Sequence, residues 1–323
     1  MQKSSIINFL VKNKNMKLID SKAELILQQG GLEGVYKQIE FCGRTCYKSE
    51  DKITEDSAKG FVDRMIKSNH TAMLEQGTVY LKIDNEDAWF NGMKEFYMAN
   101  PFSTVCGVLD KGIETLYITT NFRVIVENER WPDLSLVCEP TEHHEKRYTM
   151  KFTTDRGVSH ELVRHRVFSF AQESTRYCNY SKDKFGGEIS YIMPSWFPEA
   201  NMQQQEAFMQ IMKATEDYYM ALLGQWDERK PDARFKTGFK GNPLTPQQAR
   251  QVLPNALKTE ICMTGFACHW RFFFDLRYFG KTGKPHPDME LLATKAKTEF
   301  MRAGLWKEIM VQPSKFDKND SKG

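Results

Sequence analysis

The segment 161–177 constrains the fold of this chain most strongly, because it mixes cationic and apolar side chains in a short span. Its arginines are Arg164, Arg166 and Arg176. The apolar residues among them are Leu162, Val163, Val167, Phe168, Phe170 and Ala171. Such apolar residues predict a largely buried segment, and a buried guanidinium requires an anionic partner. The residues therefore favour phosphate or anion binding, with a solvated surface run of charge as the alternative.

Local backbone geometry predicts in which directions these arginine side chains point. Ser159 can cap a helix that continues to Arg166. Because successive helical residues turn by ~100°, Arg164 and Arg166 would point about 200° apart and serve different ligands or subunits. If the chain is extended further on, Ser174 and Arg176 face one side and can share one phosphate. No histidine is fixed beside Ser174 in sequence as a general base, so we expect a phosphate ligand and not a nucleophile.

Apolar spacing along the whole chain predicts both strands and helices. We expect an α/β (α+β) fold, a single mixed domain that is not of the Rossmann type, because the sequence has neither G-x-G-x-x-G nor a P-loop. The predicted strands are Thr78–Ile83, Thr115–Thr119 and Tyr148–Phe152. The predicted helices are Glu24–Phe41 with an interruption at Gly30-Gly31, Glu55–Ser68, one from Thr120 or Asn121 to Trp131, 159–166, Phe208–Trp226, a short helix with Arg250 that stops at Pro254, Thr264–Tyr278, and a last helix from Pro285; Cys42–Ser49 is a predicted turn.

Several blocks of this sequence resemble one enzyme family. Arg164-His165-Arg166, followed by seven residues and Ser174, matches the signature of the flavin-dependent thymidylate synthases. Arg44-Thr45-Cys46-Tyr47 resembles an early turn of that family, and Asn69–Glu75 resembles its H-x4-E segment. Ala249–Pro254 matches its A-R-x-V-L-P element, and Asp275-Leu276-Arg277 follows at the expected spacing. The chain is similar to this family from about residue 16 to residue 300, and the predicted domain is of its fold type.

The resemblance implies a thymidylate synthase. Such an enzyme methylates dUMP at C5 to give dTMP, with 5,10-methylenetetrahydrofolate as the carbon donor and FAD, reduced by NADPH, as the source of reducing equivalents. It also implies a homotetramer whose active sites combine residues from several subunits. Neither a nucleic-acid partner nor a membrane is expected.

The same resemblance implies roles for individual residues. Arg277 would be the catalytic residue, because a guanidinium can stabilise the ionised N3 of uracil. The implied dUMP-binding residues are Glu161, Arg164, Gln172, Glu173, Ser174, Thr175, Arg176, Arg250 and Arg277. The implied FAD-binding residues are Cys46, His70, Glu75, Arg164, His165 and Arg166, with His70 and Glu75 on the flavin and folate side.

Some positions depart from the family pattern. Glu161 stands where the family often has Gln, and an ionised carboxylate accepts hydrogen bonds but cannot donate them. Phe266 and Cys268 stand where many members have polar residues that contact the flavin. Phe272 replaces a third polar residue of the family. His269 or Arg271 could supply the missing flavin contacts.

The chain divides into three predicted parts. Residues 1–15 are expected to form a flexible extension, 16–310 the thymidylate synthase domain, and 311–323 a polar tail. The domain contains an insertion at about 85–146, which is long compared with compact family members. It predicts a hairpin or a helical elaboration, at a subunit interface or as a lid on the folate side, and the sequence leaves these alternatives open.

Composition limits the rival functions. The net charge is only +3 with 27% charged residues, which does not indicate nucleic-acid or membrane-surface binding. No stretch approaches the roughly 18 apolar residues of a membrane span, and the apolar run near the N-terminus is shorter than a secretory signal, so we expect a cytoplasmic protein. An RNA- or DNA-binding module lacks a supporting motif, and a Cys/His metal-dependent nuclease or deaminase lacks the P-C-x-x-C pair.

The seven cysteines form a scattered set without a CxxC pair. Two spacings are compatible with part of a metal site: Cys42-x3-Cys46, and Cys262-x5-Cys268 followed by His269. Zinc sites usually pair two such couples, so we expect reduced cysteines in or near the core and no metal.

Overall fold

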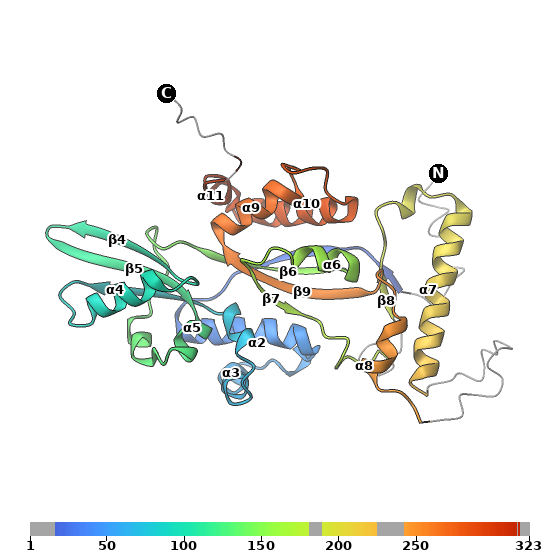
Figure 1. Ribbon diagram of the computed structural model, residues 1–323, viewed down its shortest axis with the longest axis horizontal. Coiled ribbons are helices and arrows are strands. Elements are labelled where there is room, and N and C mark those ends of the chain that lie inside the picture. The colour runs from blue at the N-terminus through green and yellow to red at the C-terminus, as the bar shows by residue number, and fades with distance from the viewer. Residues whose placement is uncertain (1–16, 181–188, 225–241, 315, 317–323) are drawn as a thin grey trace.

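The computed structural model describes residues 17–180, 189–224, 242–314 and 316, and Figure 1 shows the arrangement of their helices and strands. The strands are β1 (Lys17–Ile19), β2 (Lys22–Ile26), β3 (Thr78–Asp84), β4 (Thr104–Asp110), β5 (Ile113–Asn121), β6 (Arg147–Asp155), β7 (Ser169–Gln172), β8 (Ser190–Ile192) and β9 (Lys258–Phe266). The α-helices are α2 (Gly31–Tyr47), α3 (Ser57–Lys67), α4 (Phe90–Ala99), α5 (Phe122–Glu127), α6 (Arg156–Leu162), α7 (Met202–Leu222), α8 (Pro246–Ala249), α9 (Ala267–Arg277), α10 (Pro287–Arg302) and α11 (Trp306–Met310). Short 3₁₀ turns include η2 (Thr71–Gln76) and η7 (Arg250–Val252).

A four-stranded antiparallel sheet of order β2-β6-β9-β7 forms the centre of the molecule. One face is apolar and packs against α9, α10 and α11, which lie above the sheet in Figure 1. Met150, Phe152, Ile261 and Met263 alternate along β6 and β9 to fill this layer together with Trp270 of α9. Mixed helices and antiparallel strands confirm the predicted α+β class, and this sheet is not a parallel Rossmann sheet.

The opposite face of the sheet is polar and lies against α2. Gln38 of α2 donates to Thr149 Oγ1 at 2.9 Å, and Thr149 and Thr264 hydroxyls are 2.7 Å apart. Thr264 in turn donates to Gln76 Oε1 at 2.6 Å. Since buried polar groups are costly unless they are hydrogen-bonded, this chain of bonds fixes α2 and η2 on the sheet.

A second antiparallel sheet, of order β3-β5-β4, is built largely by the segment 85–146. β3 pairs with β5 along the whole length of β3, and the β4–β5 hairpin projects from the body at the left of Figure 1. Helices α4 and α5 belong to the same segment and pack on this sheet. The segment therefore contains both a hairpin and helices, which the sequence had offered as alternatives.

A third and smaller group of elements, after the two antiparallel sheets, contains α7 and the parallel strand pair β1–β8. The predicted helix Phe208–Trp226 corresponds to α7, which ends at Leu222, and Trp226 lies outside the described residues. The predicted extension 1–15 and most of the tail 311–323 lie outside them as well.

Periodicity located several elements correctly. The strands Thr78–Ile83, Thr115–Thr119 and Tyr148–Phe152 are confirmed within β3, β5 and β6. The helix Glu55–Ser68 is confirmed as α3, and the last predicted helix as α10, which the short α11 follows. The helix after β5 is α5; Asn121 caps it as expected, by accepting from the Val124 N–H, but it ends at Glu127 and not at Trp131.

Other predictions were wrong at the N-terminal end. Residues Glu24–Ile26 belong to strand β2, not to a helix, because Ala23 and Leu25 alternate toward the core. The predicted turn Cys42–Ser49 is mostly helix, since α2 continues to Tyr47. Gly43 allows α3 to pack closely against this part of α2: a Cβ on it would lie 2.5 Å from the Phe61 ring.

Two further corrections concern the helices near the motif. Ser159 does not cap α6; Asp155 does, by accepting from the Val158 N–H at 2.8 Å. The helix predicted from Thr264 begins only at Ala267, because Thr264 and its neighbours pair with both β6 and β7. Pairing with distant strands overrides the local helical spacing there.

Candidate functional site

The Arg164-His165-Arg166 tripeptide lies in a turn, because α6 ends at Leu162 and β7 begins at Ser169. The prediction that Arg164 and Arg166 extend from a helix is therefore wrong. Both arginines are exposed, and neither side chain makes a hydrogen bond or ion pair with a described residue. Leu162, Phe168 and Ala171 are buried as expected, whereas Val163 and Val167 are exposed. The segment is thus buried on one side only, and the two arginines face solvent.

His165 is the buried member of the tripeptide and contacts Arg277 at the end of α9. Arg277 Nε donates to His165 Nε2 at 3.1 Å, and Arg277 NH1 donates to the Glu161 carboxylate at 2.7 Å. Burial and the neighbouring guanidinium lower the pKa of His165 to about 4. His165 Nδ1 is buried and has no partner. Glu161, His165 and Arg277 therefore lie together, with the His165 ring neutral near pH 7.

The second half of the motif forms a turn at the far end of β7. The Ser174 N–H donates to Cys46 O at 3.0 Å, and the Arg176 N–H donates to Ser174 Oγ at 3.3 Å. Arg176 Nε donates to Gln247 at 3.1 Å, and Arg250 NH1 donates to Thr175 Oγ1 at 3.3 Å. The chain forms a turn here, so the extended conformation under which Ser174 and Arg176 would face one side is not present; the turn places the Arg176 N–H on the Ser174 hydroxyl and Arg250 on the neighbouring Thr175.

A network of ion pairs lies beneath this turn. Glu260 accepts from Lys48, Lys151 and Lys258 at 2.8–2.9 Å, and Lys258 also binds Glu173 at 2.9 Å. The lysines hold the pKa of Glu260 well below its ordinary value, against the effect of burial. The Glu173 carboxylate, a predicted dUMP ligand, is buried and also accepts from Tyr180 OH at 3.1 Å. Its two oxygens are thus engaged within the chain.

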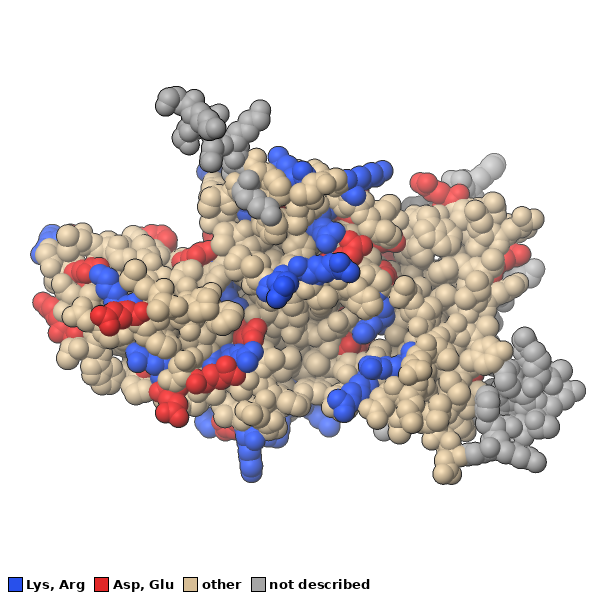
Figure 2. Space-filling view, viewed as in Figure 1, with Lys and Arg blue, Asp and Glu red and all other residues tan. Residues whose placement is uncertain are grey.

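Three arginines around the turn have no carboxylate partner among the residues that the structure describes. Arg176 and Arg250 bind neutral oxygens, and Arg156 donates to the Glu173 carbonyl at 3.2 Å. Because the lysines nearby are already balanced by Glu50, Glu173 and Glu260, the arginines leave an excess of positive charge. Such an excess, with a hydroxyl and N–H groups alongside, suits an anion. Figure 2 shows Lys and Arg side chains around a hollow in the middle of this face, where Figure 1 places β7 and α6.

The predicted flavin-side residues are divided between the two ends of β7. Cys46 and His70 lie at the Ser174 end, where Tyr47 OH is 2.9 Å from His70 Nδ1 and the Tyr47 and Tyr177 rings are 6.0 Å apart. Burial raises the pKa of Cys46 to about 11, so its thiol is protonated near neutral pH.

Glu75 lies toward the other end of β7. Arg123 NH1 donates to its carboxylate at 2.6 Å, and Arg147 NH2 donates to its carbonyl at 3.2 Å. Arg147 also reaches Ser169 Oγ, 3.5 Å away, at the first residue of β7. Glu75 is therefore near the start of β7, on the same side of the strand as Arg147.

The predicted dUMP residues are likewise not gathered in one place. Glu161, Arg164 and Arg277 lie at the start of β7, whereas Ser174, Arg176 and Arg250 lie beyond its end. Four residues at ~3.4 Å each separate the two groups by roughly 13 Å of strand. Gln172 lies between them, and its Nε2 donates to Ser159 Oγ at 2.9 Å and to Thr259 at 3.2 Å.

The three residues that depart from the family pattern, Phe266 at the end of β9 and Cys268 and Phe272 in α9, all contact other residues of the chain. Phe266 lies under the Arg147 guanidinium, Phe272 stacks on Phe316, and the Cys268 thiol donates to Glu145 at 3.0 Å. Burial and this hydrogen bond raise the pKa of Cys268 to about 12. Of the two residues expected to compensate, Arg271 binds Asp275 and the Met310 carbonyl. His269 has a buried, unpartnered Nδ1 and a pKa lowered to about 4 by burial and by Arg147.

Two residues near the site were not found from sequence. Arg147 opens strand β6 on the same face as Thr149 and Lys151, so the two-residue period could have indicated its side of the sheet. Arg123 gives no such signal, because its partner Glu75 lies 48 residues earlier.

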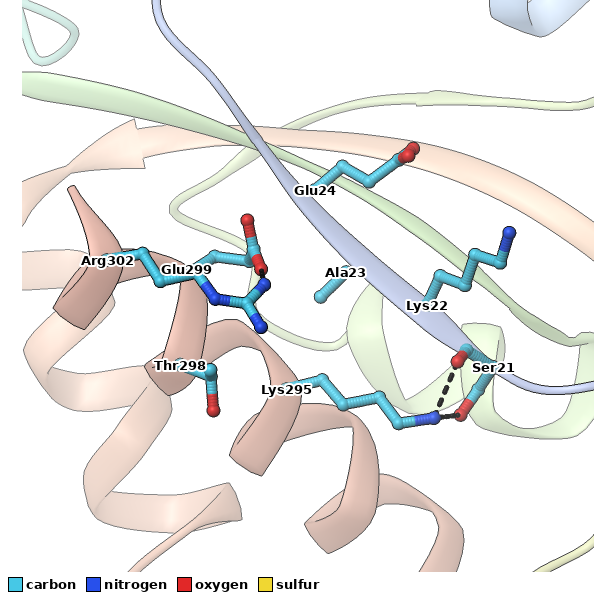
Figure 3. Close-up of a pocket in the computed structure, with 8 residues that line it drawn as sticks. All are labelled: Ser21, Lys22, Ala23, Glu24, Lys295, Thr298, Glu299 and Arg302. Atoms are coloured by element: carbon cyan, nitrogen blue, oxygen red, sulfur yellow. Dashed lines mark hydrogen bonds and ion pairs between the residues drawn. The ribbon is translucent and has the colours of Figure 1, made fainter.

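A cavity of about 440 Å³ lies elsewhere, between β2 and the C-terminal half of α10. Figure 3 shows that its charged groups do not converge: Lys295 points to Ser21, Arg302 binds Glu299, and Lys22 points away from the helix. This cavity therefore does not resemble a built anion site.

Within the described residues, no group of three or more His, Cys, Asp or Glu side chains is arranged to hold a metal ion. Cys42 and Cys262 are buried in one cluster with Ala171, and the Cys268 thiol donates to Glu145 at 3.0 Å. No described helix combines the length and the apolar character that crossing a membrane requires.

Residues 138–303 match the model of the family Thy1, described as thymidylate synthase complementing protein. This match covers just over half of the 323 residues, so the chain belongs to that family. The matched range includes both ends of β7, Arg250 and Arg277. Cys46, His70 and Glu75 lie before it.

Curated relatives are similar over part of their length. The flavin-dependent thymidylate synthase of Corynebacterium glutamicum is 32% identical over 139 residues, which are 42% of this chain and 49% of that protein. The protein of the same name from Geobacter sulfurreducens is 35% identical over 124 residues, 38% of this chain and 43% of that one. The chain thus spans about half the length of the curated relatives it matches.

Among solved structures, the UMP/dUMP methylase PolB from Streptomyces cacaoi, bound with 5-Br dUMP, aligns over 92% of this chain and 100% of its own. Its sequence identity is 14% and the TM-score is 0.41. That likeness is too weak to bear on the fold or the substrate of this chain.

Proposed function

We propose that this protein is a flavin-dependent thymidylate synthase, which methylates dUMP at C5 to give dTMP. Membership of the family and the names of the curated relatives support this reaction class. The observation that carries the proposal is the unbalanced positive charge of Arg176 and Arg250 at the Ser174–Arg176 turn, where Arg250 contacts Thr175 and the Arg176 N–H contacts Ser174 Oγ.

The phosphate of dUMP would bind at the Ser174–Arg176 turn. Arg176 and Arg250 would supply guanidinium donors, and the Ser174 hydroxyl and neighbouring N–H groups would complete the contacts. Because both arginines now bind neutral oxygens, a phosphate can replace those acceptors without breaking an ion pair. Glu173 would act indirectly, by holding Lys258 beneath the turn.

The uracil ring would lie against Arg277. A guanidinium there would stabilise negative charge on N3 and the adjacent carbonyl, which makes the ring a better nucleophile at C5. Arg277 also binds the Glu161 carboxylate, so Glu161 would fix its orientation and offset part of its charge. Gln172, between the two ends of β7, would contact the nucleotide.

FAD suits the hydrogen-bond donors near the start of β7 that have no partner among the described residues. Arg164 and Arg166 have no acidic partner among the residues described, and the buried Nδ1 of His165 is unsatisfied. Both features suit an anionic, hydrogen-bonding cofactor. Glu75, near the start of β7, and Cys46 and His70, at its far end, would line the same cofactor, whereas Phe266, Cys268 and Phe272 offer it no free polar group. FAD reduced by NADPH would supply the reducing equivalents, and 5,10-methylenetetrahydrofolate the carbon.

A homotetramer would explain why one chain separates the predicted residues into two groups. If the start of β7 in one subunit faces the far end of β7 in another, the two groups complete a single site. The exposed Arg164 and Arg166 would then contact ligand held by a neighbouring subunit.

The test is release of tritium from 5-tritiated dUMP by the purified protein supplied with FAD, NADPH and methylenetetrahydrofolate. The protein should bind FAD, become yellow, release tritium and oxidise NADPH faster when dUMP is present. A protein that binds no added FAD and releases no tritium would overturn the proposal.

A further inference from the structure

The 3₁₀ turn η2 carries Glu75, and helix α5 holds it at both ends. At its first residue, the Thr71 hydroxyl donates to Glu127 Oε1 at 2.6 Å. Near its last residue, Arg123 NH1 donates to Glu75 Oε1 at 2.6 Å. Arg123 and Glu127 are one helical turn apart and bind each other at 2.8 Å. Four side chains thus form one continuous network between the two elements.

Backbone contacts align the same two elements. The Phe122 N–H, at the start of α5, donates to the Gly77 carbonyl at 2.9 Å, directly after η2. Arg147 holds the Glu75 carbonyl from the other side. The main chain of Glu75 is therefore fixed independently of Arg123, and the side chain of Arg123 governs only the carboxylate.

That carboxylate is half-engaged. Oε1 is bound to Arg123, whereas Oε2 accepts no hydrogen bond from the residues that the structure covers. An oxygen that is held in place but unoccupied can accept from an N–H or O–H group of a ligand. From this arrangement we infer that Arg123 is a positioning residue, which directs the free oxygen of Glu75 toward FAD. The inference rests on the proposed function, in which Glu75 lines the cofactor.

The solvent exposure of this network limits how much the loss of Arg123 can change FAD affinity. The side chains of Arg123 and Glu75 are 37% and 27% exposed, so their ion pair stabilises the fold only weakly. The free energy of the Arg123–Glu75 pair is the upper limit of what orienting Glu75 can add to FAD binding, and it corresponds to about fivefold in FAD affinity. Removing Arg123 should therefore weaken FAD binding measurably while leaving the protein folded.

The experiment measures the Kd for FAD by flavin fluorescence, with thermal unfolding recorded for each variant. Arg123→Gln should raise the Kd about fivefold and leave the unfolding midpoint nearly unchanged. Arg123→Lys should recover part of the affinity, because a lysine can keep one charged bond to Glu75. Lys59→Gln breaks a remote exposed pair with Asp63 and should bind FAD like the wild type.

A double-mutant cycle tests whether Arg123 acts through Glu75. In a Glu75→Gln background, Arg123→Gln should cause no further loss of FAD affinity. Additive losses, or a wild-type Kd in Arg123→Gln, would overturn the inference. A wild-type protein that binds no FAD would overturn this inference and the proposed function together. If FAD binds and the cycle is non-additive but no tritium is released, only the proposed reaction fails.

Discussion

Arg277 Nε donates a hydrogen bond to Nε2 of His165, over 3.1 Å. Because an imidazole nitrogen that accepts a hydrogen bond carries no proton, the neutral His165 ring must hold its proton on Nδ1. Arg277 thus fixes both the tautomer and the charge of the histidine, and it leaves a buried N–H donor unsatisfied within the Arg-His-Arg turn.

The first prediction concerns the stability of the fold below neutral pH. Burial and Arg277 lower the pKa of His165 from 6.5 to about 4, so between these values the unfolded chain binds more protons. The contribution of His165 is therefore fully present above pH 6.5 and is lost as the pH falls toward 4. Between pH 7 and pH 5 this loss amounts to about 2 kcal/mol of unfolding free energy.

Urea unfolding at the two pH values measures this loss. His165→Gln should lose about 2 kcal/mol less than the wild type over the same interval. His269, whose pKa is lowered in the same direction, is present in both proteins and cancels in the comparison. An equal loss in both would show that His165 is protonated in the folded protein at pH 5.

The second prediction is that Arg176→Ala separates nucleotide binding from flavin binding. Losing a charged hydrogen bond to phosphate should weaken dUMP binding about tenfold to a hundredfold and leave the Kd for FAD nearly unchanged. Isothermal titration with each ligand measures both effects. Arg302→Ala removes an exposed arginine that binds Glu299 beside the cavity of Figure 3, and it should change neither Kd. Equal losses of both ligands in Arg176→Ala would contradict the assignment of this turn to the phosphate.

Mixed tetramers supply a third prediction. Arg176→Ala and Arg277→Ala each damage one end of β7, and each alone should have little activity at a dUMP concentration well below the weakened Kd. If an active site joins the two ends from different subunits, co-expression of the two variants should restore about one quarter of the sites. Two different affinity tags, one on each variant, allow mixed tetramers to be purified, and tritium release by these tetramers measures the recovery. Activity no higher than that of either variant would mean that both groups act from the same chain.

A fourth prediction tests the packing of the motif on the sheet. A Cβ on Gly265 would lie 2.4 Å from the Phe168 ring, so Gly265→Ala should destabilise the protein by about 1–3 kcal/mol. Gly92 of α4 has nothing within 4 Å of such an atom, and Gly92→Ala should be neutral or stabilising by up to about 1 kcal/mol. Urea unfolding compares the two variants. If Gly265→Ala is as stable as Gly92→Ala, the contact between Phe168 and β9 is not a tight one.

Elements with a clear period were predictable from sequence, and those defined by distant partners were not. Apolar residues at alternate positions identified β3 and β6, and Asn121 identified the start of α5. β9 was mistaken for the beginning of a helix, because its strand character comes from pairing with β6 and β7. The arginine turn was mistaken for a helix end for a related reason: β7 begins soon after it, and pairing with β9 sets that start.

The candidate site shows the same division. The family resemblance put Arg250 with Thr175, and Arg277 with Glu161, among the dUMP-binding residues, and a hydrogen bond joins each pair. The spacing did not reveal that the two groups occupy opposite ends of β7. It could not reveal the Arg123–Glu75 bond either, since that bond depends on how the segment 85–146 folds back onto η2.

The four residues of β7 also fix the length and the side-chain orientation of the seven-residue interval between Arg166 and Ser174. One residue inserted into this strand would turn every later side chain to the opposite face of the sheet, and the Ser174 hydroxyl and Arg176 would both leave the side of Arg250. Two inserted residues would restore the face but lengthen the interval by roughly 7 Å. Any ligand or pair of subunits that engages both turns must therefore match one length and one orientation, so this interval tolerates substitution more readily than insertion.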